Sequence, residues 1–200
     1  RRAISVAMKN RYPLGRIITG IVATCCALVA TASFGQTIFT WTGGGDGTNF
    51  DSAANWGGTA PSAAASDIAS FNGTVPGNLS LNYSDGANGF PSGPGSSGIS
   101  IQLTSSQVGN VSINNLSANA NPPNLAIYDI QIQSGAGAFS WGNNGARVNY
   151  AARPGGVVHN WVNDSSNPAT IGSNIVYVAG GGTPYTMAFG GSGDWIVNSQ

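Results

Sequence analysis

The residues that could perform chemistry are few: one histidine, His159, many serines, and acids that are all aspartates. A serine hydrolase would use His159 as the base that activates a serine hydroxyl, with an aspartate behind the imidazole. No Gly-x-Ser-x-Gly elbow accompanies any serine, so the sequence gives this arrangement little support. His159 alternates with Val157 and Trp161 along one strand-like run, which favours a structural or surface histidine.

Aspartates could instead act in pairs on a polysaccharide, because glycoside hydrolysis needs two carboxylates about 5 to 10 Å apart. Most of them stand among glycines and asparagines, where a carboxylate hydrogen-bonds to its own turn: Asp46, Asp85, Asp129, Asp164 and Asp194. With a single histidine, a zinc site would need three or four aspartates. We therefore predict no catalytic residue, no metal ligand and no cofactor, with a polysaccharide lyase or hydrolase as the lesser alternative.

The glycine-rich run Gly43–Gly47 (GGGDG) resembles two kinds of ligand loop without completing either. A phosphate cradle needs a helix N-terminus or a lysine after the glycines, and neither follows. A calcium-binding glycine–aspartate repeat needs several copies, and this is one loose copy. The sequence therefore predicts a turn here.

The charges are segregated along the chain, although the formal net charge is zero. Five of the seven cations lie in the first sixteen residues, which leaves Arg147 and Arg153 against seven aspartates, a net charge of −5. This balance argues against binding to nucleic acid or to anionic lipid, which need clustered Lys and Arg. After residue 36 the chain is rich in Gly, Asn and Ser and has no Lys or Glu, which favours turns and strands over helices.

Residues 1–36 have the three parts of a secretory signal peptide. Arg1–Arg16 is basic, Ile17–Ala32 is apolar, and the apolar part ends in an Ala-x-Ala cleavage site. The apolar part is short for a membrane span, so we expect membrane contact only through this signal or through an anchor outside the sequence. Cys25 and Cys26 both lie in it, so the processed chain would contain no disulfide.

Residues 37–98 are predicted to form an N-terminal cap segment that ends in a Gly- and Pro-rich loop. Short strands are expected at Ile38–Thr42, Asp67–Phe71 and Leu79–Tyr83. Four aromatic residues of this segment are expected to plug one end of a β core: Trp41, Phe50, Trp56 and Phe71. In the alternative interpretation they form a platform on which a sugar ring stacks.

Residues 99–200 alternate apolar and polar residues over short runs that Gly, Asn and Pro separate. The alternation slips at Tyr128-Asp129, which indicates a bulge or a corner. Such runs are typical of a parallel β-solenoid, in which each coil buries its apolar side on the next, or of an antiparallel β-sandwich. Asn-rich corners such as Asn114-Asn115 favour the solenoid. We therefore predict an all-β parallel β-helix, with helix only in the signal peptide and the sandwich as the alternative.

The stretch from Trp41 to Phe71 resembles the opening of bacterial proteins with autotransporter-associated β-strand repeats. In that family a Trp-Thr-Gly motif precedes Asn-Trp, a proline and Asp-x-Ala-x-Phe, and the matching residues are Trp41, Asn55, Trp56, Pro61, Asp67, Ala69 and Phe71. The family's Gly-x-Gly-x-Leu-x-Lys repeat and its C-terminal translocator or anchor are missing from this sequence. The resemblance implies a parallel β-helix passenger exported by a bacterium, with residues 99–200 as the first coils of a truncated solenoid.

The prediction for function is a secreted or cell-surface structural or adhesive segment without catalysis. Its partner would be a polysaccharide, or the surface of a host or neighbouring cell. If the chain is instead a polysaccharide-binding module, aromatic rings of the coils would contact the glycan, and the candidates are Trp141, Trp161 and Trp195.

Overall fold

The computed structural model describes residues 36–62, 66–83, 98–115, 126–142, 148–151, 158–172, 175–178 and 186–198. All of them belong to one structural unit, Gln36–Gln200. The predicted signal peptide, apart from Gln36, and the loop that contains Asp85 lie outside the described residues, as do Arg147 and Arg153.

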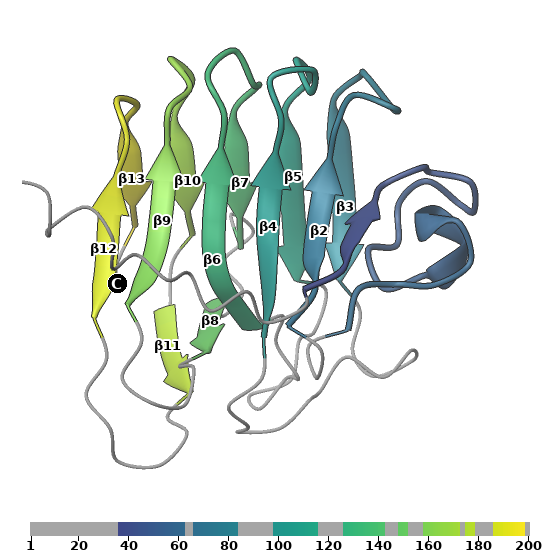
Figure 1. The fold of residues 1–200 in the computed structure, drawn as a ribbon, viewed down its shortest axis with the longest axis horizontal. Helices are drawn as coiled ribbons and strands as arrows, with labels where there is room; N and C mark the ends of the chain where they lie inside the picture. Colours follow the sequence, from purple (N-terminus) through teal and green to yellow (C-terminus); the bar gives the residue numbers. More distant parts are fainter. Residues whose placement is uncertain are drawn as a thin grey trace, which may run out of the picture. The chain divides into compact units, whose positions relative to one another are not determined.

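Two β-sheets lie one behind the other along this unit, and the chain passes repeatedly from one to the other (Figure 1). Sheet A follows the order β1-β2-β4-β6-β8-β11, and β9 pairs with both β6 and β12. Its strands are β1 Ile38–Thr40, β2 Ile68–Phe71, β4 Ile99–Leu103, β6 Ala126–Ile132, β8 Val148–Ala151, β9 His159–Asn163, β11 Ile175–Val178 and β12 Met187–Gly190. Sheet B follows the order β13-β10-β7-β5-β3, and its strands are β3 Leu79–Tyr83, β5 Val111–Asn115, β7 Phe139–Trp141, β10 Ala169–Ile171 and β13 Trp195–Val197.

Every pairing between these strands is parallel, which confirms the predicted β-solenoid and excludes an antiparallel sandwich. On sheet B the partners in one row are Leu79, Val111, Phe139, Ala169 and Trp195. They follow one another at intervals of 32, 28, 30 and 26 residues, and each interval is one coil.

Alternation along the strands directs apolar side chains inward and polar ones outward. The burial pattern of β3 shows this, because Leu79, Leu81 and Tyr83 are buried while Ser80 between them is exposed. Stacking places inward residues of successive coils against one another, and burying an aliphatic side chain stabilises the fold by roughly 1.5–3 kcal/mol. The core therefore consists of continuous apolar rows between the two sheets.

The bulge predicted at Tyr128-Asp129 is confirmed. Ile99 of β4 lies opposite Ile127 of β6, whereas Ile101 lies opposite Ile130, so one residue of β4 faces two of β6. At this point the carbonyl oxygen of Tyr128 and the carboxylate of Asp129 accept hydrogen bonds from β9.

The coils begin earlier than the sequence suggested. A boundary was predicted at residue 98, but β2 pairs with β4 and β3 pairs with β5, so both strands belong to the stacked coils. The segment that precedes them contains β1 and the 3-10 helix η1, Ala53–Trp56, which is the only helical turn in the described part of the chain (Figure 1). One turn of four residues agrees with the prediction of an all-β chain.

Glycines at one corner allow successive coils to approach closely. A Cβ atom on Gly109 would lie 2.2 Å from the carbonyl oxygen of Gly77, and one on Gly137 would lie 2.4 Å from that of Gly109. Backbone sits directly against backbone here, so a side chain does not fit between the coils.

Candidate functional site

The head loop, Gly43–Thr48, is organised around the carboxylate of Asp46. The backbone N–H groups of Thr48 and Asn49 each donate to Asp46 Oδ1 at 2.9 Å, and Asn49 Nδ2 donates to Asp46 Oδ2. Asn55 Nδ2 adds a bond to Oδ1 at 2.8 Å. The Asn49 N–H, then the Asn55 side chain and the Thr48 N–H, hold the pKa of Asp46 well below its ordinary value of 3.8.

Asn55 lies behind this loop with its side-chain amide in four hydrogen bonds. Its Oδ1 atom accepts from the N–H of Gly45 at 2.9 Å and from that of Gly47 at 3.0 Å. Its Nδ2 atom donates to Asp46 and, at 2.8 Å, to the carbonyl oxygen of Asn49. The residue is fully buried. The loop therefore surrounds an amide of its own chain, as a ligand-binding loop surrounds a ligand.

The four aromatic residues predicted as a plug meet beside this loop. Trp56 stands edge-on to Trp41 at 5.0 Å and to Phe50 at 5.2 Å between ring centroids, and Phe71 contacts all three rings. Trp56 Nε1 donates to the carbonyl oxygen of Phe50 at 2.6 Å. All four side chains are buried, so none offers a face on which a sugar could stack.

Two of the three candidate glycan contacts lie in the core. Trp141 and Trp161 are buried and pack against each other with centroids 6.0 Å apart. A buried indole cannot contact a glycan, so the prediction for these two residues is wrong: their strand positions face the opposite sheet. Trp195 is half-buried and lies 5.4 Å from Phe189, in the last coil.

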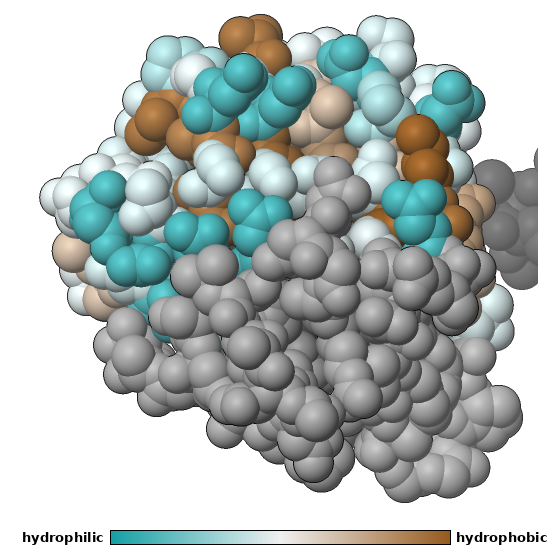
Figure 2. All heavy atoms as spheres, turned by 180° about the vertical axis from the view of Figure 1, so that it is seen from behind, coloured by the Kyte–Doolittle hydropathy of each residue, from teal (hydrophilic) through white to brown (hydrophobic). Residues whose placement is uncertain are grey.

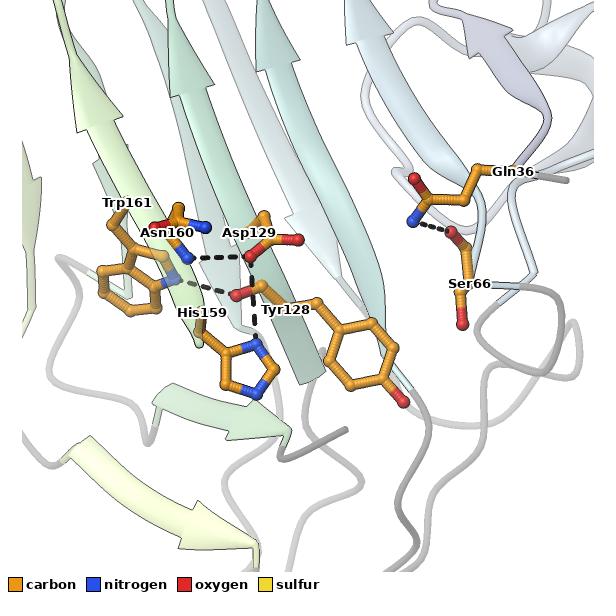
Figure 3. A network of polar contacts seen from close by, with 7 residues as sticks. All are labelled: Gln36, Ser66, Tyr128, Asp129, His159, Asn160 and Trp161. Atoms are coloured by element: carbon orange, nitrogen blue, oxygen red, sulfur yellow. Dashed lines mark hydrogen bonds and ion pairs between the residues drawn. The ribbon is translucent and has the colours of Figure 1, made fainter. Parts of the chain in front are cut away.

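His159 lies at the start of β9, beside the bulge of β6 (Figure 3). Its imidazole stacks on Tyr128 with centroids 5.6 Å apart, and its Nδ1 atom lies 3.9 Å from Asp129 Oδ1. The imidazole is 1% exposed, so a substrate would not reach it in this conformation. The arrangement agrees with a structural histidine.

Two further bonds fix the bulge. Trp161 Nε1 donates to the carbonyl oxygen of Tyr128 at 3.1 Å, and the N–H of Asn160 donates to Asp129 Oδ1 at 2.9 Å. The Asp129 carboxylate thus accepts a strand hydrogen bond at the point where the ladder of β6 is interrupted (Figure 3). Asp129 has a structural task.

The outer faces carry rows of polar side chains. On sheet A, Ser70 donates to Gln102 at 3.1 Å, and Gln102 donates to Gln131 at 3.4 Å. On sheet B, Ser140 donates to Ser112 at 2.9 Å. Figure 2, which views the molecule from behind, shows hydrophilic groups interspersed with smaller apolar ones on the described surface. Ser70 is buried, whereas Gln131 is exposed and Gln102, Ser112 and Ser140 are partly exposed, so these four side chains are accessible to a partner.

Neither a metal site nor a membrane span emerges from the part of the chain that the structure describes. No group of three or more His, Cys, Asp or Glu side chains within it is placed to hold a metal ion. None of its helices is long and apolar enough to cross a bilayer.

Sequence reasoning missed a second buried amide, Asn163. It lies on the inward row of sheet A, after Leu103 and Ile132. Its Nδ2 atom donates to the carbonyl oxygens of Asn167 and Asp194, each at 3.0 Å, so it joins two successive corners. The sequence signal for this buried amide is an asparagine at an inward position of a run that alternates apolar and polar residues.

Comparison of the chain with protein-family models, with curated proteins and with solved structures gave no match.

Proposed function

We propose that the chain is a secreted, non-catalytic β-solenoid segment that holds an extended polar surface outside a bacterial cell. The observation that carries the proposal is the repetition of one cross-section: each coil contributes inward apolar residues, and neighbouring outward residues such as Gln102 and Gln131 join in rows. A stack of this kind satisfies its backbone within itself and gives a rigid, regular face.

The head fits this role as a closure of the first coil. An uncovered sheet edge attracts other strands, and β1 lies along β2 while Asn49 bridges to Asn82 of β3. The aromatic plug fills the end of the core between the two sheets. The loop that Asp46 and Asn55 hold together fixes the chain on the outer side of this plug. On this proposal the loop is a structural device and has no ligand of its own.

The proposed partner is a polysaccharide or the surface of a neighbouring or host cell. Contact would be made by the outer polar rows, because Trp141 and Trp161 are buried. Gln102→Ala together with Gln131→Ala would then reduce binding to cells or immobilised polysaccharide, while Asn72→Ala, at an exposed turn, would not. Equal binding by both variants would contradict this contact surface.

Export is the first property to test. The full chain with a C-terminal tag would be expressed in a Gram-negative bacterium, followed by fractionation and N-terminal sequencing. We expect cleavage near Ala32 and the processed protein outside the cytoplasm, whereas Leu28→Arg, which interrupts the apolar part, should keep the chain uncleaved. Wild-type chain that stays uncleaved in the cytoplasm would refute secretion, and release of new polysaccharide ends by the purified protein would refute the absence of catalysis.

A further inference from the structure

The turn after β2 begins with an asparagine that is followed by a glycine. Asn72 is exposed, and it is the only asparagine in the described part of the chain that precedes a glycine. Asn88 and Asn144 also precede glycines, but they lie outside the described residues. The backbone nitrogen after such an asparagine is open to the side chain, because glycine has no Cβ atom to shield it. This turn therefore brings together a carboxamide and a nitrogen that can react with it.

The Asn72 side chain is folded back along its own backbone. Its Oδ1 atom accepts from the N–H of Thr74 at 3.1 Å and from Thr74 Oγ1 at 2.7 Å. This is an Asx turn, in which the side chain imitates a turn of the backbone. The carboxamide carbon, Cγ, is thereby held beside the peptide bond that joins Asn72 to Gly73.

The Gly73 nitrogen is free to attack this carbon. Its N–H donates to no acceptor within the described ranges, so no hydrogen bond has to break before the nitrogen reacts. Gly73 has a φ of 82°, which a residue with a side chain rarely adopts. The turn thus requires glycine at the position where a side chain would obstruct ring closure.

The two bonds from Thr74 also favour the reaction electrostatically. When a nitrogen adds to Cγ, negative charge develops on Oδ1, the atom that both donors contact. Donors that are already in place stabilise such a charge without rearrangement, as in the oxyanion hole of an acyl-transfer enzyme. The turn therefore both holds the carboxamide and activates it.

We propose that Asn72 is a site of spontaneous modification, at which the carboxamide closes on the Gly73 nitrogen and loses ammonia. A bond forms between the Gly73 nitrogen and Cγ, the bond between Cγ and Nδ2 breaks, and the departing ammonia carries the proton of the Gly73 N–H. Water then opens the resulting succinimide ring at either carbonyl group. Opening at one carbonyl gives aspartate and opening at the other gives isoaspartate, so the net reaction consumes a water and releases an ammonia.

The modification takes place where successive coils touch. A Cβ atom on Gly73 would lie 2.4 Å from the carbonyl oxygen of Ser106, so the turn sits directly against the corner between β4 and β5. Aspartate adds a negative charge at this corner, and isoaspartate also inserts a methylene group into the main chain. The reaction therefore changes the charge, and in one product the chain length, at a close contact between coils.

Asn110 provides an internal reference in the same molecule. It is also exposed, lies directly before β5, and accepts a hydrogen bond at Oδ1 from the N–H of Ala138 at 3.0 Å. The residue after it is Val111, whose branched side chain obstructs ring closure. Asn110 should keep its amide under conditions in which Asn72 loses it.

The test is incubation of the purified protein at neutral and at mildly alkaline pH, followed by proteolysis and mass spectrometry of the peptides that contain Asn72 and Asn110. We expect Asn72 to be converted to aspartate and isoaspartate, and faster at the higher pH, because the attacking nitrogen must lose its proton. Hydroxylamine added during the incubation should cleave the chain after residue 72, because it attacks the succinimide ring. Circular dichroism shows that the protein remains folded.

Thr74→Val tests the contribution of the turn. Valine has the shape of threonine and keeps the backbone N–H, so this variant removes only the donor at Oγ1. Conversion of Asn72 should slow by about three- to tenfold, which corresponds to one hydrogen bond. Thr170→Val is the matched control, because Thr170 lies on β10, away from this turn, and its replacement should leave the rate unchanged. An Asn72 amide that persists, a conversion without cleavage by hydroxylamine, or equal rates in the two variants would overturn the proposal.

Discussion

Asn55 donates a hydrogen bond to Asp46 across 2.8 Å, which ties a fully buried amide to an exposed carboxylate. In the sequence, the glycines around Asp46 resemble those of a ligand-binding loop. In the structure, the amide of Asn55 occupies the donors that a ligand would use, and the carboxylate accepts from its own loop. Residue types that are typical of a ligand-binding loop thus hold this loop closed on itself.

Asn55→Ala should lower the free energy of unfolding by about 2–3 kcal/mol, because it removes four hydrogen bonds of a buried group. Urea denaturation of the processed protein measures the change. Asn72→Ala is the control, since Asn72 is an exposed turn residue whose amide oxygen accepts from Thr74, and its effect should stay within about 0.5 kcal/mol. Similar losses in the two variants would contradict the role of Asn55.

Asp46 should make the protein sensitive to acid. Its folded pKa lies below the ordinary value of 3.8, so the unfolded chain binds the proton first as the pH falls. The stabilisation is present above the unfolded pKa and is lost as the pH decreases toward the folded one. The Tm difference between wild type and Asp46→Asn should therefore shrink between about pH 6 and about pH 2. A Tm difference for Asp46→Asn that stays constant over this pH range would refute the effect.

The indole N–H of Trp161 should matter more than that of Trp41. Trp161 Nε1 donates to Tyr128, whereas Trp41 Nε1 is buried and has no hydrogen-bond partner among the described residues. Both rings are fully buried, so Trp161→Phe and Trp41→Phe remove the same atoms from similar surroundings. We expect Trp161→Phe to be the more destabilising by about 1–3 kcal/mol, because it loses a hydrogen bond, whereas Trp41→Phe removes a buried donor that has no partner in the described part of the chain. Equal unfolding free energies would show that this bond does not hold the bulge.

Local patterns were enough to predict much of the fold. Strands expected at Asp67–Phe71 and Leu79–Tyr83 are found at Ile68–Phe71 and Leu79–Tyr83. Ala169–Ile171 was missed, because three residues that begin with alanine carry little intrinsic strand preference. This strand, β10, is held by its pairing with β7 and β13, which lie 30 and 26 residues away in register.

Whether a side chain is buried or exposed is harder to predict than the strand on which it lies. Alternation places Trp161 on one face with His159, but which face meets the opposite sheet depends on partners in other coils. For that reason Trp141 and Trp161 were assigned to a surface and are found in the core. The family resemblance marked Asn55 as a motif residue, whereas its four bonds depend on how the glycine loop closes around it.

The glycine column at the corner provides a direct test of coil stacking. Gly109→Ala should destabilise the fold by about 3 kcal/mol or more, because its Cβ would lie 2.2 Å from the carbonyl oxygen of Gly77 and a backbone atom cannot move aside without parting the coils. Gly77→Ala is the matched control in the same column: a Cβ there meets nothing within 4 Å, so its effect should stay within about 1 kcal/mol. Thermal and urea unfolding of the two variants distinguish crowding from a general loss of glycine. If Gly77→Ala lowered the free energy of unfolding as much as Gly109→Ala, the loss would arise from the change in backbone freedom. Close contact between the coils would then not explain the glycine at this corner.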